Sequence, residues 1–196
     1  MSDAATLAFY EANAARYSHD LRPEHSRYLD TFLDRLNPGV RVLELGCGGG
    51  RDAARMVEHG FPVDPTDAAR GMVANARRSF GLPARQLRFE ELDADAAYDA
   101  IWAHACLIHV PRAEFARVLA AIRRALRPGG WHFANYKLGD GEGRDPLGRL
   151  TNFPDETWLG DAYRTAGFAI VGTERYRGEG ADGVVRDWYA LTVRRD

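Results

Sequence analysis

The chain has 196 residues, a length that suits one domain with a complete hydrophobic core. Hydrophobic residues make up 45% of the sequence and the formal net charge is −2, which argues against a general affinity for nucleic acid or acidic membranes. Two cysteines, Cys47 and Cys106, are too few for a disulfide framework or a zinc site. Because the sequence also shows neither a signal-like start nor a bilayer-length apolar run, we expect a cytoplasmic protein without a bound metal.

Two helices are predicted ahead of the first strand, over residues 3–18 and 24–36, because apolar side chains recur there at helical spacing. A turn-forming Asn-Pro-Gly sequence at 37–39 ends the second helix. The aromatic residues of the first helix could serve packing alone. Alternatively, Arg16 and Tyr17 could cap a ligand pocket formed further along the chain.

The segment 40–52, VRVLELGCGGGRD, carries the strongest signal in the sequence. Its alternating apolar residues predict a strand that ends at Gly46, and a helix follows the glycines at once. Gly46 and Gly48 would leave backbone N–H groups bare for a small polar ligand. Arg51 stands where a dinucleotide fingerprint needs its third glycine. Glu44, an ionisable residue in a buried strand, could hold the loop or a cationic ligand by hydrogen bonds.

A second strand is predicted at 61–66, followed by a helix at 68–79 that Gly81 closes. Asp67 comes where this strand ends, a position from which its carboxylate could accept hydrogen bonds from both hydroxyls of a ribose. Alternatively, Asp67 only caps the helix. Asp64 is a rival for the ribose role, although it precedes the end of the strand.

Three further strands are predicted at 85–89, 98–105 and 131–136, with a long amphipathic helix at 112–126. This alternation of strands and helices is typical of a parallel sheet covered by helices.

Two histidines follow the fourth predicted strand closely. A histidine among apolar residues is more often a packed, hydrogen-bonded one, and we expect this of His109. His104 stands at the carboxyl end of the strand, where ligands of open α/β sheets bind, so that a functional role is equally plausible.

Residues 138–153 form a stretch rich in glycine and charge that we predict to be a loop, before a helix at 156–166. A loop of this length is usually a functional cover or disordered, so it is a candidate substrate lid, and a solvated insertion is the alternative. Two alternating segments at 168–176 and 184–195 predict a terminal hairpin. The residues here that we expect to contact a substrate are Tyr136, Lys137, Arg144, Arg149 and Asn152.

The segment Val42–Gly50 resembles the first motif of the class I S-adenosylmethionine-dependent methyltransferases, in which an acidic residue precedes Gly-x-Gly. Together with TDAARGM and HACLIHVPRAEF, the pattern is most similar to small bacterial methyltransferases of the tellurite-resistance type. The resemblance covers residues 41–193 and implies an α/β fold: a doubly wound, seven-stranded, mostly parallel Rossmann-like sheet with an antiparallel C-terminal hairpin strand and helices on both faces. It implies a single domain, with a helical cap (1–38), a cofactor-binding core (39–137), the candidate lid (138–153) and a C-terminal helix and hairpin (154–196).

The resemblance also implies the cofactor, S-adenosylmethionine, and its product, S-adenosylhomocysteine. In the family, an aspartate near the end of the third strand binds the adenine amino group, but Arg88 occupies that position here. Either Glu90 supplies the contact, or adenine is held by backbone and by packing against Phe89. The expected cofactor contacts are Tyr17, Glu44, Gly46, Cys47, Gly48, Arg51, Asp67, Ala68, Phe89, Glu90 and His104.

The predicted function is methyl transfer to a small-molecule acceptor by positioning and in-line displacement. His104 is the candidate base, ahead of Tyr136 and His109, if the acceptor must lose a proton. An anionic acceptor would instead be bound by Lys137 and its neighbouring arginines, without a base. The alternatives are a dinucleotide enzyme and a non-catalytic module that binds an adenosine compound. We expect no nucleic-acid or membrane partner, and a monomer or weak homodimer.

Overall fold

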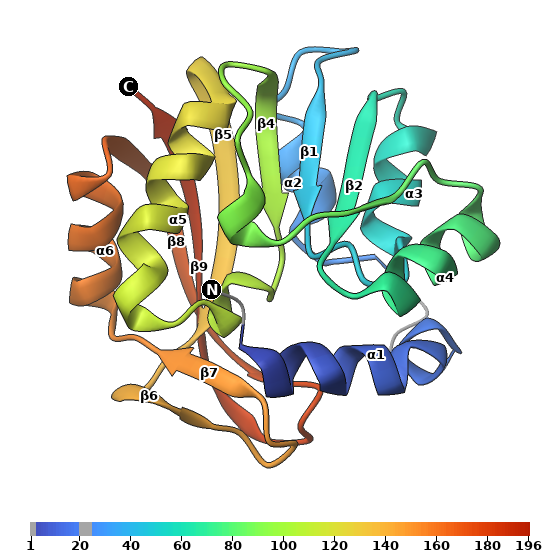
Figure 1. Cartoon of the computed structure of the whole chain (residues 1–196). Helices are drawn as coiled ribbons and strands as arrows, with labels where there is room; N and C mark the ends of the chain where they lie inside the picture. Colours follow the sequence, from blue (N-terminus) through green and yellow to red (C-terminus); the bar gives the residue numbers. More distant parts are fainter. Residues whose placement is uncertain (1–2, 20–24) are drawn as a thin grey trace.

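The computed structural model describes residues 3–19 and 25–196, and the side chains of residues 17–19 lie outside the described part. Its centre is a seven-stranded sheet in the order β3-β2-β1-β4-β5-β9-β8 (Figure 1). The strands are β1 (Val42–Leu45), β2 (Val63–Asp67), β3 (Arg85–Gln86), β4 (Tyr98–Ala103), β5 (Leu126–Lys137), β8 (Phe168–Glu179) and β9 (Val185–Arg195). The first five strands pair in parallel, and β9 is antiparallel to both of its neighbours. The predicted fold class is therefore confirmed.

Helices cover both faces of the sheet (Figure 1). On one face, α5 (Arg112–Ala125) and α6 (Glu156–Thr165) bury apolar side chains such as Phe115 and Leu159 against the strands. On the other face, α2 (Leu29–Leu33) and α3 (Arg51–Glu58) pack Phe32 and Met56 against Trp102 of β4. This burial on both sides explains why β1 and β4 read as nearly continuous apolar runs.

Two more helices, α4 and α1, complete the helical layer around the sheet. The helix α4 (Arg70–Phe80) packs beside α3 and ends at Gly81, whose φ of 64° is left-handed. The helix α1 (Ala4–His19) runs across the carboxyl ends of the strands, between α4 and the small hairpin described below (Figure 1). The carboxylate of Glu11 on α1 accepts hydrogen bonds from the backbone N–H groups of Arg70 and Gly71, at 2.7 and 2.8 Å. Since those N–H groups lie at the start of α4, Glu11 caps that helix and fixes α1 to it.

The stretch predicted as a loop, 138–153, is instead largely a β-hairpin. Its strands β6 (Gly141–Arg144) and β7 (Leu150–Phe153) pair in antiparallel register from Gly141 opposite Phe153 to Arg144 opposite Leu150. The carboxylate of Asp145 closes the turn by accepting hydrogen bonds from the backbone N–H groups of Leu147 and Arg149, both at 3.0 Å. Glycines take alternate positions of β6 and β7 has only four residues, so neither strand shows a clear alternation of apolar and polar side chains in the sequence.

Three boundaries also differ from the prediction. The helix expected at 24–36 is only α2, since a single apolar turn suffices to cover the sheet there. The strand expected at 85–89 stops after Gln86, and residues 89–91 form a short 3-10 helix, η1 (Phe89–Glu91), where the Glu91 carboxylate accepts from the Arg88 backbone N–H at 2.9 Å. By contrast, β5 is longer than predicted. No helix in the described part of the chain is both long and apolar enough to cross a membrane.

Candidate functional site

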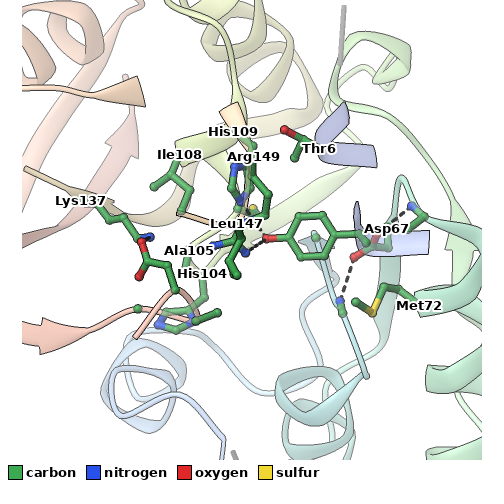
Figure 2. Close-up of a pocket in the computed structure, with 18 of the residues that line it drawn as sticks. Thr6, Asp67, Met72, His104, Ala105, Ile108, His109, Lys137, Leu147 and Arg149 are labelled. Carbon is green, nitrogen blue, oxygen red and sulfur yellow. Dashed lines mark hydrogen bonds and ion pairs between the residues drawn. The ribbon is translucent and has the colours of Figure 1, made fainter. Parts of the chain in front are cut away.

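A cavity of about 840 Å³ lies at the carboxyl ends of the strands (Figure 2). Its walls come from the turns after β1, β2 and β4, the end of β5, the helix α1, the β6–β7 turn and the β8–β9 turn. Volumes of roughly 300–1,000 Å³ are typical of small-molecule sites. The cavity is therefore large enough for a nucleoside-type cofactor and a second small molecule.

The glycine loop after β1 forms one wall, and its glycines are needed for different reasons. Gly46, Gly48 and Gly50 have left-handed φ values of 68°, 53° and 89°. A Cβ on Gly46 would lie 2.4 Å from the Cβ of Cys106, and one on Gly50 would lie 2.7 Å from Leu82, so both are required by close packing. A Cβ on Gly48 would meet nothing within 4 Å, and Gly48 lines the cavity. Gly48 therefore presents bare backbone to a ligand.

Asp67 fixes this loop to the end of β2. Its Oδ2 accepts a hydrogen bond from the Gly48 N–H and its Oδ1 from the Ala69 N–H, each at 2.9 Å. Burial raises the pKa of Asp67 to about 6, although these two hydrogen bonds act in the opposite direction. The rival carboxylate, Asp64, is held by Arg85 at 2.9 and 3.0 Å. Of the two rival carboxylates, Asp67 is thus the one that lines the cavity, and its oxygens have lone pairs for further donors.

The residues expected to contact the cofactor divide into two groups. Those that line the cavity are Gly46, Gly48, Arg51, Asp67, Ala68, Phe89 and His104. Glu44, Cys47 and Glu90 do not line it in the described part of the chain. The side chain of Tyr17 lies outside the described residues, whereas its neighbour Arg16 lines the cavity.

The side chains of Glu44, near the end of β1, and of Cys47, within the glycine loop, are buried away from the cavity, which corrects the expectation of direct contact. Glu44 is 3% exposed, and burial raises the pKa of its carboxyl, with Asp52 and Asp67 adding to the shift. It accepts a hydrogen bond from the backbone of Ala53 in the first turn of α3, so it supports the helix behind the loop. Cys47 is buried, and its backbone N–H donates to the Thr66 carbonyl at 2.8 Å.

The turn after β4 contains His104, and its backbone is strained at the next residue. The ring of His104 stacks on Trp102, with centroids 6.0 Å apart and planes 11° apart. The next residue, Ala105, has a left-handed φ of 51°, which is unfavourable for a residue with a Cβ. Its N–H donates to the Asn135 side chain at 2.6 Å, and the Asn135 amide donates to the Tyr176 hydroxyl at 2.9 Å. All of these except Trp102 line the cavity, so the strain is held at the site itself.

A hydrogen-bonded network joins α1 to the opposite wall. The Tyr10 hydroxyl lies 2.8 Å from Nε2 of His109 and 2.9 Å from Nη1 of Arg149. The Nδ1 of His109 lies 2.6 Å from the Leu150 carbonyl oxygen. Figure 2 shows His109 and Arg149 side by side, with Asp67 on the other side of the cavity. Burial lowers the pKa of His109 to about 4, so its imidazole is neutral at physiological pH.

The cations expected to bind an anionic substrate are all paired with carboxylates. Lys137 lies 2.8 Å from Asp182 and Arg149 lies 2.6 Å from Asp145, and all four side chains are at most 2% exposed. Arg144 is half-exposed, lies outside the cavity wall, and pairs with Asp3 at 2.6 Å. These pairs hold the site together, because they join β5 to the β8–β9 turn, close the β6–β7 turn and tie that hairpin to the start of α1.

Tyr136 and Asn152 do not reach the cavity, which corrects their expected substrate contacts. Tyr136 is fully buried on the α5–α6 face, and its hydroxyl lies 2.7 Å from that of Tyr163. Side chains alternate along a strand, so its neighbours Asn135 and Lys137 face the cavity instead. Asn152 is fully buried in β7, and its amide has no hydrogen-bond partner among the described residues.

Several wall residues were not foreseen from the sequence. The sequence predicts only a packing role for Tyr10, and it predicts the β8–β9 turn only as the connection of a hairpin. Neither position shows a local motif, although the polar glycine-rich run GEGADG marks an unusual turn. The unforeseen residues include Thr6, Leu7, Tyr10, Met72, Ile108, Leu147, Tyr176, Glu179, Asp182 and Trp188.

The sheet has the strand order of the class I S-adenosylmethionine-dependent methyltransferase fold. As in that fold, the glycine turn after β1 and the carboxylate at the end of β2 line one cavity. Residues 42–130 match the family model described as a methyltransferase domain. A ubiquinone biosynthesis O-methyltransferase from Methylocella silvestris is 30% identical, over 100% of this chain and 71% of that protein. The chain therefore belongs to the S-adenosylmethionine-dependent methyltransferase family.

Other similar proteins agree with this family. A Thiobacillus denitrificans protein of the same name as the Methylocella relative is 29% identical over 67% of this chain, and the match spans 62% of that protein's own length. The crystal structure of a 1,6-didemethyltoxoflavin-N1-methyltransferase from Burkholderia thailandensis has a TM-score of 0.75 and 25% identity, covering 96% of this chain and 88% of that one. That structure contains 1,6-didemethyltoxoflavin and S-adenosylhomocysteine.

The cofactor of this family is S-adenosylmethionine, and the residues present fit it. The bare backbone of Gly48 and the carboxylate of Asp67 lie on one wall, and the ring of Phe89 lines the same cavity. A carboxylate suits ribose hydroxyls, and an aromatic ring suits a flat purine. Of the two residues predicted for the adenine contact, Phe89 lines the cavity and Glu90 does not.

Proposed function

We propose that this chain transfers the methyl group of S-adenosylmethionine to a small, uncharged acceptor. The observation that carries the proposal is that Gly48 and Asp67 meet on the wall of a cavity whose other wall is lined by aromatic residues and paired charges. The first wall suits the cofactor. The second suits a flat polar molecule.

In this proposal each element of the cofactor wall has one task. The loop from Gly46 to Gly48 and the nearby Arg51 hold the amino-acid portion, where backbone N–H groups at the start of α3 favour a carboxylate. Asp67 accepts hydrogen bonds from the ribose hydroxyls. Phe89 and the backbone at Ala68 hold the adenine. His104 lies between the two walls, next to the reacting centre.

Methyl transfer requires mainly that the acceptor atom be aligned with the methyl group. S-adenosylmethionine supplies an electrophilic methyl group on a positively charged sulfur. The chain's own residues bind the acceptor, orient it and exclude water, and such alignment can lower a barrier by about 7–11 kcal/mol. The strained turn at Ala105, held by Asn135, fixes the position of His104 for this purpose.

The acceptor is proposed to be uncharged because the two cations at that end of the cavity, Lys137 and Arg149, already pair with buried carboxylates. Binding an anion would require Lys137 or Arg149 to give up a buried carboxylate partner, which is costly. Tyr176 and Trp188 line the acceptor end and stack with centroids 6.1 Å apart and planes 16° apart. A hydroxylated aromatic or nitrogen heterocycle fits this wall. The names of two relatives agree with this class: one is a ubiquinone biosynthesis O-methyltransferase and the other a 1,6-didemethyltoxoflavin-N1-methyltransferase.

We also propose that α1 and the hairpin segment 138–153 together cover the acceptor end. Three contacts support this: Arg144 pairs with Asp3, the Thr6 hydroxyl accepts from the Leu150 N–H at 2.8 Å, and Arg149 donates to Tyr10. Release of these contacts would open the cavity, and their formation would exclude water.

Three finer assignments stay proposals. The tellurite-resistance type rests on the motifs TDAARGM and HACLIHVPRAEF. A cytoplasmic location is consistent with the two buried, unpaired cysteines, Cys47 and Cys106. We propose a monomer or a weak homodimer, because a stable dimer would need a large exposed apolar face. In the described part of the chain, the large exposed apolar residues are few, and Val57 and Phe80 are examples.

The test uses the purified chain with methyl-labelled S-adenosylmethionine and a panel of phenols, catechols and nitrogen heterocycles, each beside a carboxylated or phosphorylated analogue. Label transfer to uncharged members, and its loss in Asp67→Ala, is the expected result. Transfer confined to the anionic analogues would overturn the proposed acceptor class. Binding of S-adenosylhomocysteine without transfer to any member would favour the non-catalytic alternative.

A further inference from the structure

The network around Tyr10 joins three separate segments at the acceptor end of the cavity. Tyr10 comes from α1, His109 from the short 3-10 helix η2 (Leu107–His109) after β4, and Arg149 from the β6–β7 turn. All three side chains line the cavity. The contacts between them are short, at 2.8 and 2.9 Å.

The direction of every hydrogen bond in this network follows from the chemistry of its ends. The Leu150 carbonyl can only accept, so Nδ1 of His109, 2.6 Å away, carries the imidazole proton. In the neutral ring Nε2 then has a lone pair, and the Tyr10 hydroxyl must donate to it. The Arg149 guanidinium can only donate, so it donates to the Tyr10 oxygen.

Tyr10 is therefore placed between a proton acceptor and a cation. Its O–H bond points at the His109 lone pair, and its oxygen is polarised by Arg149, whose own charge is balanced by Asp145 at 2.6 Å. The charged groups that face His109 are Arg149, Lys137 and Asp145. Arg149 and Lys137 are both cations, and together with burial they keep the resting imidazole neutral, so that Nε2 holds a lone pair toward Tyr10, while Asp145 acts in the opposite direction.

We propose that Tyr10 is a catalytic residue that takes the proton of the acceptor's O–H or N–H group and passes its own hydroxyl proton to Nε2 of His109. This assignment rests on the proposed function, and it makes Tyr10, in place of His104, the base. The acceptor's X–H bond breaks and its electron pair forms the new X–C bond, while the C–S bond breaks with its pair left on sulfur. One proton moves from the acceptor to Tyr10 and one from Tyr10 to His109. The positive charge thus ends on the imidazole, and total charge is conserved.

His109 acts through Tyr10, so it is a positioning residue that also stores the proton. His104 has a different setting, because its ring stacks on Trp102 and on Phe133, 6.0 and 6.5 Å away. Stacking fixes that ring as part of the cavity wall.

The experiment compares catechol, whose hydroxyl is protonated at neutral pH, with 4-nitrocatechol, whose hydroxyl is largely ionised and needs no base. Tyr10→Phe keeps the ring that packs against His109 and removes only the hydroxyl. His109→Gln keeps an acceptor for Tyr10 without a basic nitrogen. His59→Gln, which changes a histidine outside the cavity, is the matched control. Thermal unfolding shows that each variant is folded.

For catechol, we expect kcat to fall about 100-fold in Tyr10→Phe and His109→Gln with little change in KM, and by less than about threefold in the control His59→Gln. For 4-nitrocatechol all variants should stay within about threefold of the wild type. If kcat of Tyr10→Phe and His109→Gln fell by the same factor for both acceptors, the network would have only a structural role and the proposal would be overturned. A wild-type chain that methylates neither these acceptors nor any other in the panel would refute the proposed function, and the base assignment with it.

A second readout needs neither cofactor nor acceptor. In protein labelled with ¹⁵N-histidine, His109 should carry its proton on Nδ1, and its pKa should rise in Tyr10→Phe because the hydrogen bond that favours the neutral ring is lost. A proton on Nε2, or a His109 pKa unchanged by that substitution, would contradict the proposed direction of transfer.

Discussion

Alanine substitutions at Gly46 and Gly48 should separate close packing from ligand access within one loop. Both residues have a left-handed φ, so each alanine costs about 1–2 kcal/mol of backbone strain. At Gly46 the added Cβ would lie 2.4 Å from the Cβ of Cys106, and overpacking of this kind adds about 1–3 kcal/mol. The total is about 2–5 kcal/mol for Gly46→Ala and about 1–2 kcal/mol for Gly48→Ala.

Urea unfolding measures these losses, and calorimetric titration with S-adenosylhomocysteine measures binding. Gly48→Ala should remain folded yet bind at least about tenfold more weakly, since its methyl group enters open space on the cavity wall. In Gly46→Ala, the additional change Cys106→Gly should recover part of the lost stability, as a positive coupling in a double-mutant cycle. The reasoning is refuted if Gly46→Ala is as stable as the wild type, or if Gly48→Ala is the more destabilised of the two.

Three further predictions concern the buried ionisable groups. Asp67→Ala should weaken S-adenosylhomocysteine binding by about 1.5–3 kcal/mol for each charged hydrogen bond lost, and an unchanged Kd would exclude the ribose role. Lys137→Met should cost up to about 3 kcal/mol in urea unfolding, because it removes one of the two cations, Lys137 and Arg186, that pair with the buried Asp182. Combining it with Asp182→Asn should cost less than the two changes separately, and additive losses would contradict a coupled pair. Burial lowers the pKa of His109 and His132 from 6.5 to about 4, so the unfolded chain binds more protons between these values. Each histidine's contribution is complete above pH 6.5 and is lost as the pH falls through 4, up to about 3 kcal/mol apiece. The raised pKa of Asp67 acts oppositely, so the measurement is the difference in pH slope between wild type and His132→Gln, and equal slopes would contradict a neutral buried His132.

The parts of the site that could be predicted are those encoded by neighbouring residues. Gly46 and Gly48 follow a strand directly and precede a helix, so a short pattern contains the whole loop. Asp67 likewise stands at the end of the next strand. Parallel strands bring such positions to one edge of the sheet, and the structure places these three residues on one cavity wall.

The acceptor end could not be predicted because its contacts join distant parts of the chain. Tyr10 is 99 residues from His109 and 139 from Arg149 in sequence, and no local pattern links them. Charge alone was misleading as well. Lys137 and Arg149 were expected to bind substrate, but the carboxylates that neutralise them lie in turns whose folding the glycine-rich sequence concealed.

Calorimetric titration of the wild-type chain with S-adenosylhomocysteine, beside NAD, tests the central claim most directly. We predict one-to-one binding of S-adenosylhomocysteine and no detectable heat with NAD, since Gly48, Asp67 and Phe89 form a nucleoside site and Arg51 replaces the third glycine of a dinucleotide loop. Binding of NAD with equal or higher affinity, or no binding of S-adenosylhomocysteine by folded protein, would contradict the account.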